Sequence, residues 1–300
     1  MSDDLLRFGT VGSPQTTPGT GTPAAIAHSR ELGLDHLEIA WTRSVRVSDE
    51  TCAEIKATAE AHNISLSVHA PYFINLNSQD AEKMRKSDER LLAAARAGYK
   101  CGARDIVFHP GSYHKQPPEE VYPVVRDQLH SIVETLQGEG VDVTLRPETM
   151  GKQAVFGTLE ENLRLSVDVP GVLPCVDWAH LYARTGNGGF NSRDAFDRAL
   201  DTMGEMLGAE GMGRVHFHMS GIAYTKKGEK AHIPLFTCEQ HYVDLFQAFV
   251  DYDVAGTIGI EAPSPFHTAD ALTLQGIYRY LRDEAEGKAQ PKRHAKDGQA

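Results

Sequence analysis

The chain has 300 residues, 41% of them hydrophobic, which is enough to bury a full core. Its formal net charge of -11 excludes a general affinity for nucleic acid, because binding of phosphate groups depends on clustered lysine and arginine. Any contact with nucleic acid must therefore use local basic patches. The candidates are Arg43 with Arg46, the group Lys83, Arg85 and Lys86, and the TKKGEK segment at 225–230.

The four cysteines, at positions 52, 101, 175 and 238, form no C-x-x-C pair and are too few for a disulfide framework. Unpaired thiols are typical of reducing compartments. The first residues, MSDDLLRFG, include neither a basic leader nor an apolar segment, and no run reaches the roughly 18 apolar residues that a membrane-spanning helix needs. We therefore expect a soluble, cytoplasmic protein with reduced thiols and no membrane contact, and we take it to be a monomer.

Strand-like and helix-like segments alternate along the chain, an order that indicates parallel strands joined by crossover helices. The candidate strands follow one another at very roughly 30 to 40 residues, the spacing that repeated strand-helix units require. Eight such units predict an α/β fold, the (β/α)8 TIM barrel, which often forms one domain of about 250 residues. The candidate strands are residues 7–11, 35–40, 64–69, 104–109, 141–148, 172–177, 213–219 and 256–261.

Four positions carry the signals of a helix start. A Ser or Thr side chain just before a helix can accept a hydrogen bond from the free N–H groups of the first turn, and a Glu or Gln three residues later completes a capping box. Proline also fits the first helical turn. The predicted starts are Thr22 with Pro23, Ser48 before two acidic residues, Thr158 with Glu161, and Thr237 with Gln240.

The last residues, EGKAQPKRHAKDGQA, are polar and contain proline, a composition that cannot bury enough apolar surface to fold. We expect one barrel domain over residues 1–285 and a disordered polar tail over residues 286–300. His294 lies in this tail and is not expected to bind metal.

Histidines and carboxylates stand at the C-terminal ends of successive candidate strands, which is where the active sites of (β/α)8 barrels lie. Imidazole nitrogen and carboxylate oxygen are ligands that zinc and manganese accept, and ligands on different strands hold the coordination geometry rigidly. The ligand types add up to more than one ion. The candidates are His69, His109, Glu148, Asp177, His180, His216, His218 and Glu261.

Several of these residues lie in recognisable motifs. They are VHAPYFINL at 68–76, FHPGS at 108–112, D-x-x-H at 177–180, H-M-S-G at 218–221, the A-H pair at 231–232 and the I-E pair at 260–261. Together they resemble endonuclease IV, the metal-dependent apurinic/apyrimidinic endonuclease of base-excision repair. The match runs in order from roughly residue 8 to residue 280, so it covers the whole barrel.

The resemblance implies an enzyme that uses a cluster of two or three zinc ions, with manganese as an alternative, to cleave damaged double-stranded DNA 5′ to abasic sites. The glycine-rich segment GTGTP at 19–23 lacks the G-K-[ST] of a phosphate loop, so we expect no nucleotide cofactor. Glu148 would bridge two ions and act as a catalytic residue, and Tyr72 matches a tyrosine that enters the DNA near the lesion. The resemblance assigns His69 and His109 to a first ion, Asp177, His218 and Glu261 to a second, and His180 and His232 to a third.

The chain departs from the family pattern at the third ion. Where the family has D-x-H, this chain has Lys230, Ala231 and His232, and an ammonium group does not bind zinc. We expect the Lys230 side chain to fill the place of the third ion and to act beside Glu148 as a catalytic residue, with its charge against the scissile phosphate. The alternative is that Lys230 faces solvent and Glu229 swings in as a ligand.

Three further positions need a choice. Glu148 is shifted by one residue from the glutamate of the family, and Pro147 before it is a residue type found at bulges. His216 and His218 share one face of a strand, and we assign His218 as the ligand because its H-M-S-G run matches the family. His216 is then a residue of the barrel interior. Glu38 is either a substrate contact or a salt-bridged interior carboxylate.

A sugar isomerase or epimerase on the same barrel is the alternative function, because four of the candidates would satisfy its single divalent ion. His69 with His109 favours phosphodiester hydrolysis instead, since a mononuclear sugar enzyme has no need of them as ligands. A second alternative is a non-catalytic barrel that binds damaged DNA or a partner. The four ligands that an epimerase would use are Glu148, Asp177, His218 and Glu261.

Overall fold

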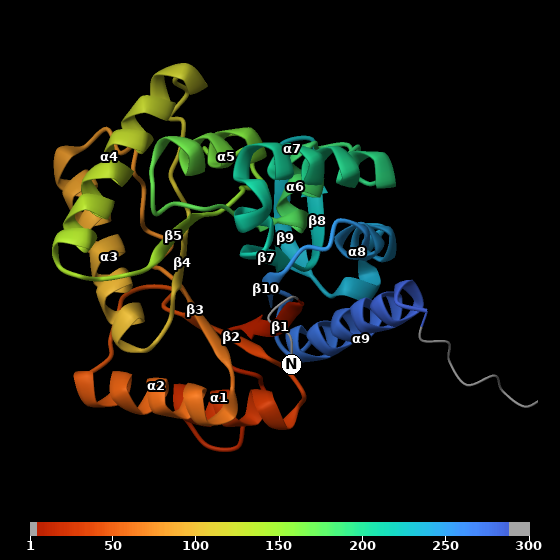
Figure 1. Cartoon of the computed structure of the whole chain (residues 1–300). Helices are drawn as coiled ribbons and strands as arrows, with labels where there is room; N and C mark the ends of the chain where they lie inside the picture. Colours follow the sequence, from red (N-terminus) through yellow and green to blue (C-terminus); the bar gives the residue numbers. More distant parts are fainter. Residues whose placement is uncertain (1–4, 288–300) are drawn as a thin grey trace, which may run out of the picture.

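The computed structural model describes residues 5–287, and its centre is a barrel of eight parallel strands (Figure 1). The strands are hydrogen-bonded in the order β5-β4-β3-β2-β1-β10-β7-β6. Between β5 and β6 the barrel is nearly closed by isolated bridges that join Leu145 to Val172 and Glu148 to Cys175. The barrel strands are β1 (Leu6–Val11), β2 (His36–Ala40), β3 (Ser65–His69), β4 (Asp105–Phe108), β5 (Thr144–Pro147), β6 (Cys175–Asp177), β7 (Val215–Met219) and β10 (Gly256–Ile260).

Helices surround the strands on the outside of the barrel (Figure 1). Each of the eight candidate strands overlaps one of the observed barrel strands, so the predicted TIM barrel is confirmed. The helices are α1 (Thr22–Glu31), α2 (Asp49–His62), α3 (Ala81–Lys100), α4 (Pro118–Gly138), α5 (Leu159–Asp168), α6 (Trp178–Arg184), α7 (Arg193–Met212), α8 (Tyr242–Asp251) and α9 (His267–Ala285).

Three of the four predicted helix starts are confirmed. Helix α1 begins at Thr22 with a proline in its first turn, and Ser48 caps α2 by accepting a hydrogen bond from the Thr51 backbone N–H at 3.2 Å. Thr158 and Glu161 form the capping box of α5. Such caps satisfy N–H groups that have no partner within the helix and stabilise each helix by about 1 kcal/mol.

The fourth predicted helix start, at Thr237, is wrong. Thr237 ends a short 3-10 helix (Leu235–Thr237), and α8 begins later, at Tyr242, without a side-chain cap. The Gln240 side chain is instead turned towards Trp178, to whose backbone oxygen its amide donates a hydrogen bond at 3.0 Å, and the Thr237 hydroxyl donates to the backbone oxygen of Pro234 at 2.8 Å.

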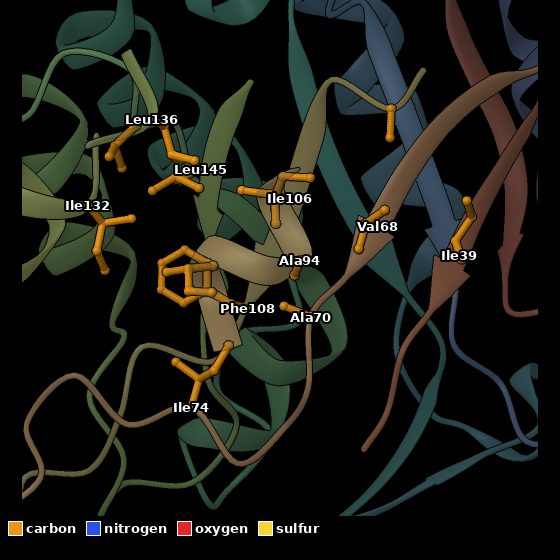
Figure 2. Close-up of a cluster of buried hydrophobic side chains, with 14 of the residues drawn as sticks. Ile39, Val68, Ala70, Ile74, Ala94, Ile106, Phe108, Ile132, Leu136 and Leu145 are labelled. Atoms are coloured by element: carbon orange, nitrogen blue, oxygen red, sulfur yellow. The ribbon is translucent and has the colours of Figure 1, made fainter. Parts of the chain in front are cut away.

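Two hydrophobic clusters fill the space between the barrel and its helices. Val68, Ile106 and Leu145, from neighbouring strands, pack in one of them with Ala94 of α3 and Leu136 of α4 (Figure 2). The second cluster lies around β1, β6, β7 and β10 and contains the fully buried Trp178. Because the apolar side chains of the strands point outwards into these clusters, the alternate residues are left to line the barrel interior.

The barrel interior is unusually polar. Its lower part holds the Asp105–Arg146 pair, whose Oδ1 and Nε atoms are 2.6 Å apart, and Arg146 is buried. Arg146 also donates hydrogen bonds to the backbone oxygens of Pro174 and Arg214. A buried charge is tolerated only where it is paired and hydrogen-bonded, and this one is.

An antiparallel hairpin, formed by β8 (Gly221–Thr225) and β9 (Gly228–Ile233), follows β7. It docks against the loop after β5, where the Glu229 backbone N–H donates to the Gly151 oxygen at 3.0 Å and Gly228 forms a bridge with Lys152. The hairpin therefore lies at the end of the barrel where the parallel strands end.

The predicted tail lies almost entirely outside the described residues, as does His294, so its disorder stays a prediction. Over residues 5–287, no helix is both long enough and apolar enough to cross a bilayer. Each of the four cysteines carries a free thiol.

Candidate metal centre

Glu148 is the centre of a group of histidines at the C-terminal end of the barrel, and it is fully buried. Its Oε2 atom lies 3.4 Å from His69 Nε2 and 3.1 Å from His109 Nε2. Its Oε1 atom lies 3.2 Å from His180 Nδ1 and 3.5 Å from His218 Nδ1. The four histidines come from four different strand ends, so the barrel itself sets their positions.

The orientation of Glu148 follows from ordinary strand alternation. Arg146, two residues earlier, points into the barrel, and Glu148 continues on the same face. The pairing of β4 with β5 runs without interruption from Asp105 with Thr144 to Phe108 with Pro147, so the bulge suggested by Pro147 is not observed. The one-residue shift from the family pattern therefore leaves the carboxylate inside the barrel.

The first ligand group consists of His69, His109 and Glu148, whose ligand atoms all lie within 4.8 Å of one another. His69 Nδ1 lies 2.9 Å from the backbone oxygen of Ala70, to which it can only donate a proton. In the neutral ring, that contact keeps the proton on Nδ1, so Nε2, which is directed at Glu148, is the atom that would bind a metal ion.

The second ligand group consists of Glu148, Asp177, His218 and Glu261. His218 lies on β7 and is fully buried, and its Nδ1 atom is 3.6 Å from Glu261 Oε1. Asp177 ends β6 and accepts a hydrogen bond from the His180 backbone N–H at 2.7 Å through Oδ1, which leaves Oδ2 directed into the group. These are the four residues that a single divalent ion would require.

The third ligand group consists of His180, Glu229 and His232. His180 Nδ1 lies 2.9 Å from the Thr149 backbone oxygen, and His180 Nε2 lies 3.6 Å from Glu229 Oε2. His232 Nδ1 is held by the Ser220 hydroxyl at 2.6 Å. From the sequence, Glu229 was only the alternative to Lys230 at this position.

The hairpin explains why Glu229 and His232 meet. Ala223 pairs with Ala231 and Tyr224 pairs with Glu229, so Lys230 is the extra residue of a β-bulge. Without a bulge, residues 230 and 232 would share a face of the strand. With it, Glu229 turns to the same face as His232.

Lys230 is therefore not where we expected it. Its side chain is exposed on the outside of the hairpin and does not line the cavity over the cluster, whereas Glu229 does. The structure thus has the alternative arrangement, with Lys230 towards solvent. Gly151 makes room for Glu229: a Cβ atom at residue 151 would lie 2.7 Å from the Glu229 Cβ and 2.9 Å from the His180 Cδ2.

The donor set fits divalent cations. Both oxygens of Glu148, Oδ2 of Asp177 and Nδ1 of His218 are buried and have no hydrogen-bond partner among the described residues. The contacts around Glu148 are close but not aligned as hydrogen bonds. Unpartnered buried carboxylate oxygens are costly, and a bound cation is the usual way in which proteins satisfy them.

The electrostatics of the cluster follow from the same contacts. Burial by itself would raise the pKa of Glu148, but the surrounding histidines, His109 first among them, hold it well below its ordinary value. Burial would lower the pKa of His69, but the Glu148 carboxylate raises it to about 9. Without ions, the cluster thus keeps its carboxylate charged and some of its imidazoles protonated.

A cavity of about 590 Å³ lies over the cluster, and His69, His109, His180, His232 and Glu261 are part of its wall. Tyr72 and Phe73 stand at its rim with 46% and 51% of their surfaces exposed, and their ring centroids are 4.3 Å apart. Large exposed aromatic side chains beside a cavity are typical of a binding surface.

Glu38 and His216 lie inside the barrel below the cluster, and both are fully buried. Glu38 Oε2 is 2.9 Å from His216 Nε2, and His216 Nδ1 is 2.6 Å from the Thr257 hydroxyl. Of the two interpretations of Glu38, the structure has the interior carboxylate, which is paired with His216. His216 is an interior residue, as we expected.

Comparison with known proteins places these observations in a family. Residues 26–282 match the model of the family described as xylose isomerase-like TIM barrel. The uncharacterized protein MJ0133 of Methanocaldococcus jannaschii is 35% identical over 277 residues, which are 92% of this chain and 98% of that protein. A probable endonuclease 4 of Pediococcus pentosaceus is 27% identical over 191 residues, 60% of each chain.

Solved structures share the fold at low identity. Endonuclease IV from Thermus thermophilus superposes with a TM-score of 0.68 at 23% identity, over 93% of this chain and 99% of that one. A D-tagatose 3-epimerase-like protein superposes with a TM-score of 0.69 at 17% identity, over the same shares. Endonucleases and epimerases are thus similar to this chain in fold. The family match covers most of the barrel, and the chain belongs to the family of xylose isomerase-like TIM barrels.

Proposed function

We propose that this protein is a metal-dependent phosphodiester hydrolase that cleaves DNA 5′ to abasic sites. The observation that carries the proposal is that Glu148 belongs to two groups of metal-binding side chains and that a third group adjoins them under the same cavity. Centres with more than one ion are typical of enzymes that hydrolyse phosphodiesters. Endonuclease 4 proteins among the relatives of this chain support the same conclusion.

A sugar epimerase is the second candidate, because the group of Glu148, Asp177, His218 and Glu261 would by itself hold one divalent ion. Epimerases among the solved structures of similar fold favour it. An epimerase of this kind has no need of the His69 and His109 group as ligands. It has no need of the hairpin ligands Glu229 and His232 either. A phosphodiester hydrolase therefore accounts for more of the ligand residues in the centre.

Basic residues on the loops around the centre also support an anionic substrate. Seven exposed cations lie on the loops after the strands and on the hairpin. Among the described residues, only one of these seven, Lys152, has an acidic partner within ion-pair distance, which is Glu229 at 3.9 Å. Local clusters of this kind can bind phosphates in a protein that is acidic as a whole. The set consists of Arg43, Arg46, Lys115, Lys152, Lys226, Lys227 and Lys230.

The basic group of Lys83, Arg85 and Lys86 belongs to the structure of α3 instead. Arg85 pairs with Glu82 and Glu89 on the same helix, and Lys86 lies 3.3 Å from Glu82. These cations are largely neutralised along the helix surface, so we do not assign the group a role in substrate binding.

The division of roles in this proposal follows the geometry. Divalent ions in such a centre stabilise the charge of the phosphodiester and lower the pKa of water. The chain itself fixes the imidazoles: the backbone oxygens of Ala70 and Thr149 hold Nδ1 of His69 and His180, so each ring presents Nε2. Tyr72 and Phe73 offer ring faces on which an exposed base can stack.

The test is a cleavage assay on an end-labelled duplex with a single abasic site, with common ketoses assayed for epimerisation in parallel. We expect one incision, 5′ to the site, that a chelator abolishes and added zinc or manganese restores. An otherwise identical duplex without the lesion is the control. Epimerisation at an ordinary enzymatic rate, together with an intact abasic duplex, would overturn the proposal in favour of the second candidate.

A further inference from the structure

His218 faces the metal centre differently from its neighbours. His180 has Nδ1 at the Thr149 oxygen and 3.2 Å from Glu148 Oε1, and its Nε2 is turned towards Glu229. His69 and His232 have Nδ1 held by a nearby oxygen and turn Nε2 towards the centre. His218 does the reverse: its Nδ1 atom lies 3.5 Å from Glu148 Oε1, and its Nε2 atom points down into the barrel. The residue that must hold the His218 ring through Nε2 therefore lies deeper in the barrel, below the ring.

That residue is Glu38. Its Oε1 atom lies 3.0 Å from His218 Nε2, and both side chains are fully buried. The contact is close but not aligned as a hydrogen bond. Neither Glu38 Oε1 nor His218 Nε2 has another hydrogen-bond partner among the described residues. The Cys175 thiol also lies beside the His218 ring, but a thiol is a weak acceptor and cannot replace a carboxylate.

The Glu38 carboxylate is itself fixed from the other side. Its Oε2 atom accepts a hydrogen bond from the Ser67 hydroxyl at 2.5 Å and lies 2.9 Å from His216 Nε2. His36 Nε2 lies 3.0 Å from the Ser67 oxygen, and Thr257 holds His216. The carboxylate is thus clamped by donors on Oε2, which leaves Oε1 as the acceptor for His218.

We propose that Glu38 is the positioning residue of His218: it keeps the proton on Nε2 and so directs the lone pair of Nδ1 at the ion that Asp177 and Glu261 also hold. A metal-binding histidine typically donates its second N–H to a carboxylate or carbonyl oxygen, and loss of such a partner lowers metal affinity by about 10- to 100-fold. The inference depends on the metal centre of the proposed function, but it does not depend on DNA as the substrate.

The sharpest variant is Glu38→Gln, which has the same shape. Ser67 and His216 donate to Oε2, so the amide oxygen should take that place and the amide NH2 should face His218. A donor at that position requires His218 Nε2 to accept, which moves the ring proton to Nδ1 and blocks the ligand atom. The exchange therefore reverses the tautomer without removing volume.

Metal affinity, measured by chelator competition on the full chain, is the readout, together with the thermal midpoint of the metal-free protein. We expect Glu38→Gln to weaken one of the bound zinc ions by about 10- to 100-fold and to leave the others unchanged. Ser67→Ala, which removes one clamping donor, should weaken the same ion by a smaller factor. Asp270→Asn is the matched control, a buried carboxylate on α9 that accepts a hydrogen bond from the Leu235 backbone N–H.

Unchanged affinities in Glu38→Gln would overturn the inference, and a lower thermal midpoint with unchanged affinities would show a purely structural role. If Glu38→Gln does not fold, the Ser67→Ala variant is the test. Zinc affinities in Ser67→Ala equal to those of the wild-type protein would then overturn the inference. A wild-type protein that binds no zinc removes the metal centre and this inference together. A wild-type protein that binds zinc but does not cleave DNA contradicts the proposed function alone.

Discussion

Glu148 is the residue on which the centre depends most, because two of the ligand groups include it. Its two oxygens lie near imidazoles from four strand ends, and none of these contacts is an aligned hydrogen bond. The Glu148 carboxylate is therefore a buried anion that no aligned hydrogen bond holds in place. The first test therefore measures how many metal ions this carboxylate helps to bind.

Glu148→Gln should reduce the number of tightly bound transition-metal ions below that of the wild type, which we expect to hold at least two per chain. The change removes a negative charge next to two ions at once, and losses of about 10- to 100-fold in affinity are typical even for less direct partners. Elemental analysis after gel filtration measures the number. Glu161→Gln, a buried carboxylate in the capping box of α5, is the control. One ion or none in the wild-type protein would contradict the multi-ion centre.

Tyr72→Ala should weaken binding of an abasic duplex while leaving the free energy of unfolding nearly unchanged, since 46% of the side chain is exposed. Stacking of a base on an aromatic ring contributes about 1 to 3 kcal/mol, which corresponds to a roughly 5- to 150-fold loss of affinity. Fluorescence anisotropy with a labelled duplex measures it. Tyr280→Ala, on the outside of α9 and 50% exposed, should bind normally, and equal losses in both variants would remove the assignment.

At the scale of elements, the β8–β9 hairpin decides the third ligand group. Its bulge at Lys230 turns Glu229 towards His180 and His232, and the contacts of Gly228 and Glu229 with the loop after β5 hold it there. We expect Glu229→Gln to lose a bound ion that Lys230→Ala keeps. Metal content of the two variants, measured side by side, checks this. Loss of the ion from Lys230→Ala, with full content in Glu229→Gln, would reverse the assignment.

The position of Glu148 could be predicted from the sequence, whereas that of Glu229 could not. The barrel strands have apolar residues on one face and end in ligand residues, so period-two alternation places Glu148 and His218 correctly. Along β9 the same rule would place Lys230 rather than Glu229 beside His232, because a bulge shifts the alternation by one residue. The bulge is held by backbone contacts with residues 151–152, far away in the chain, and no local pattern reports them. At the false start at Thr237, the contact of Gln240 with Trp178 is likewise one that no local pattern reports.

At the scale of the whole molecule, the free energy of unfolding of the metal-free protein should fall as the pH rises above 6.5. The folded protein holds the pKa of His69 at about 9 and that of His180 at about 10, against 6.5 as the ordinary value. Raised pKa values stabilise the fold fully below pH 6.5, and this stabilisation is lost as the pH rises through the folded values.

Urea unfolding with a chelator present, at pH 6.5 and at pH 9 to 10, measures this effect, and we expect a loss of several kcal/mol, since one pKa unit corresponds to about 1.4 kcal/mol. The zinc-loaded protein should not show it, because bound imidazoles are already neutral. His69→Gln should reduce the slope in the metal-free protein. A free energy that stays constant or rises over this range would contradict the charge distribution described here.

The number of bound metal ions separates a phosphodiester hydrolase from a sugar epimerase on the same barrel, and we expect more than one ion in the centre. Crystals of the zinc-loaded protein, with anomalous scattering recorded on both sides of the zinc edge, locate each ion directly. We expect separate peaks between His69 and His109, among Asp177, His218 and Glu261, and among His180, Glu229 and His232. A single peak among Asp177, His218 and Glu261, with no zinc at the other two groups, would contradict this expectation.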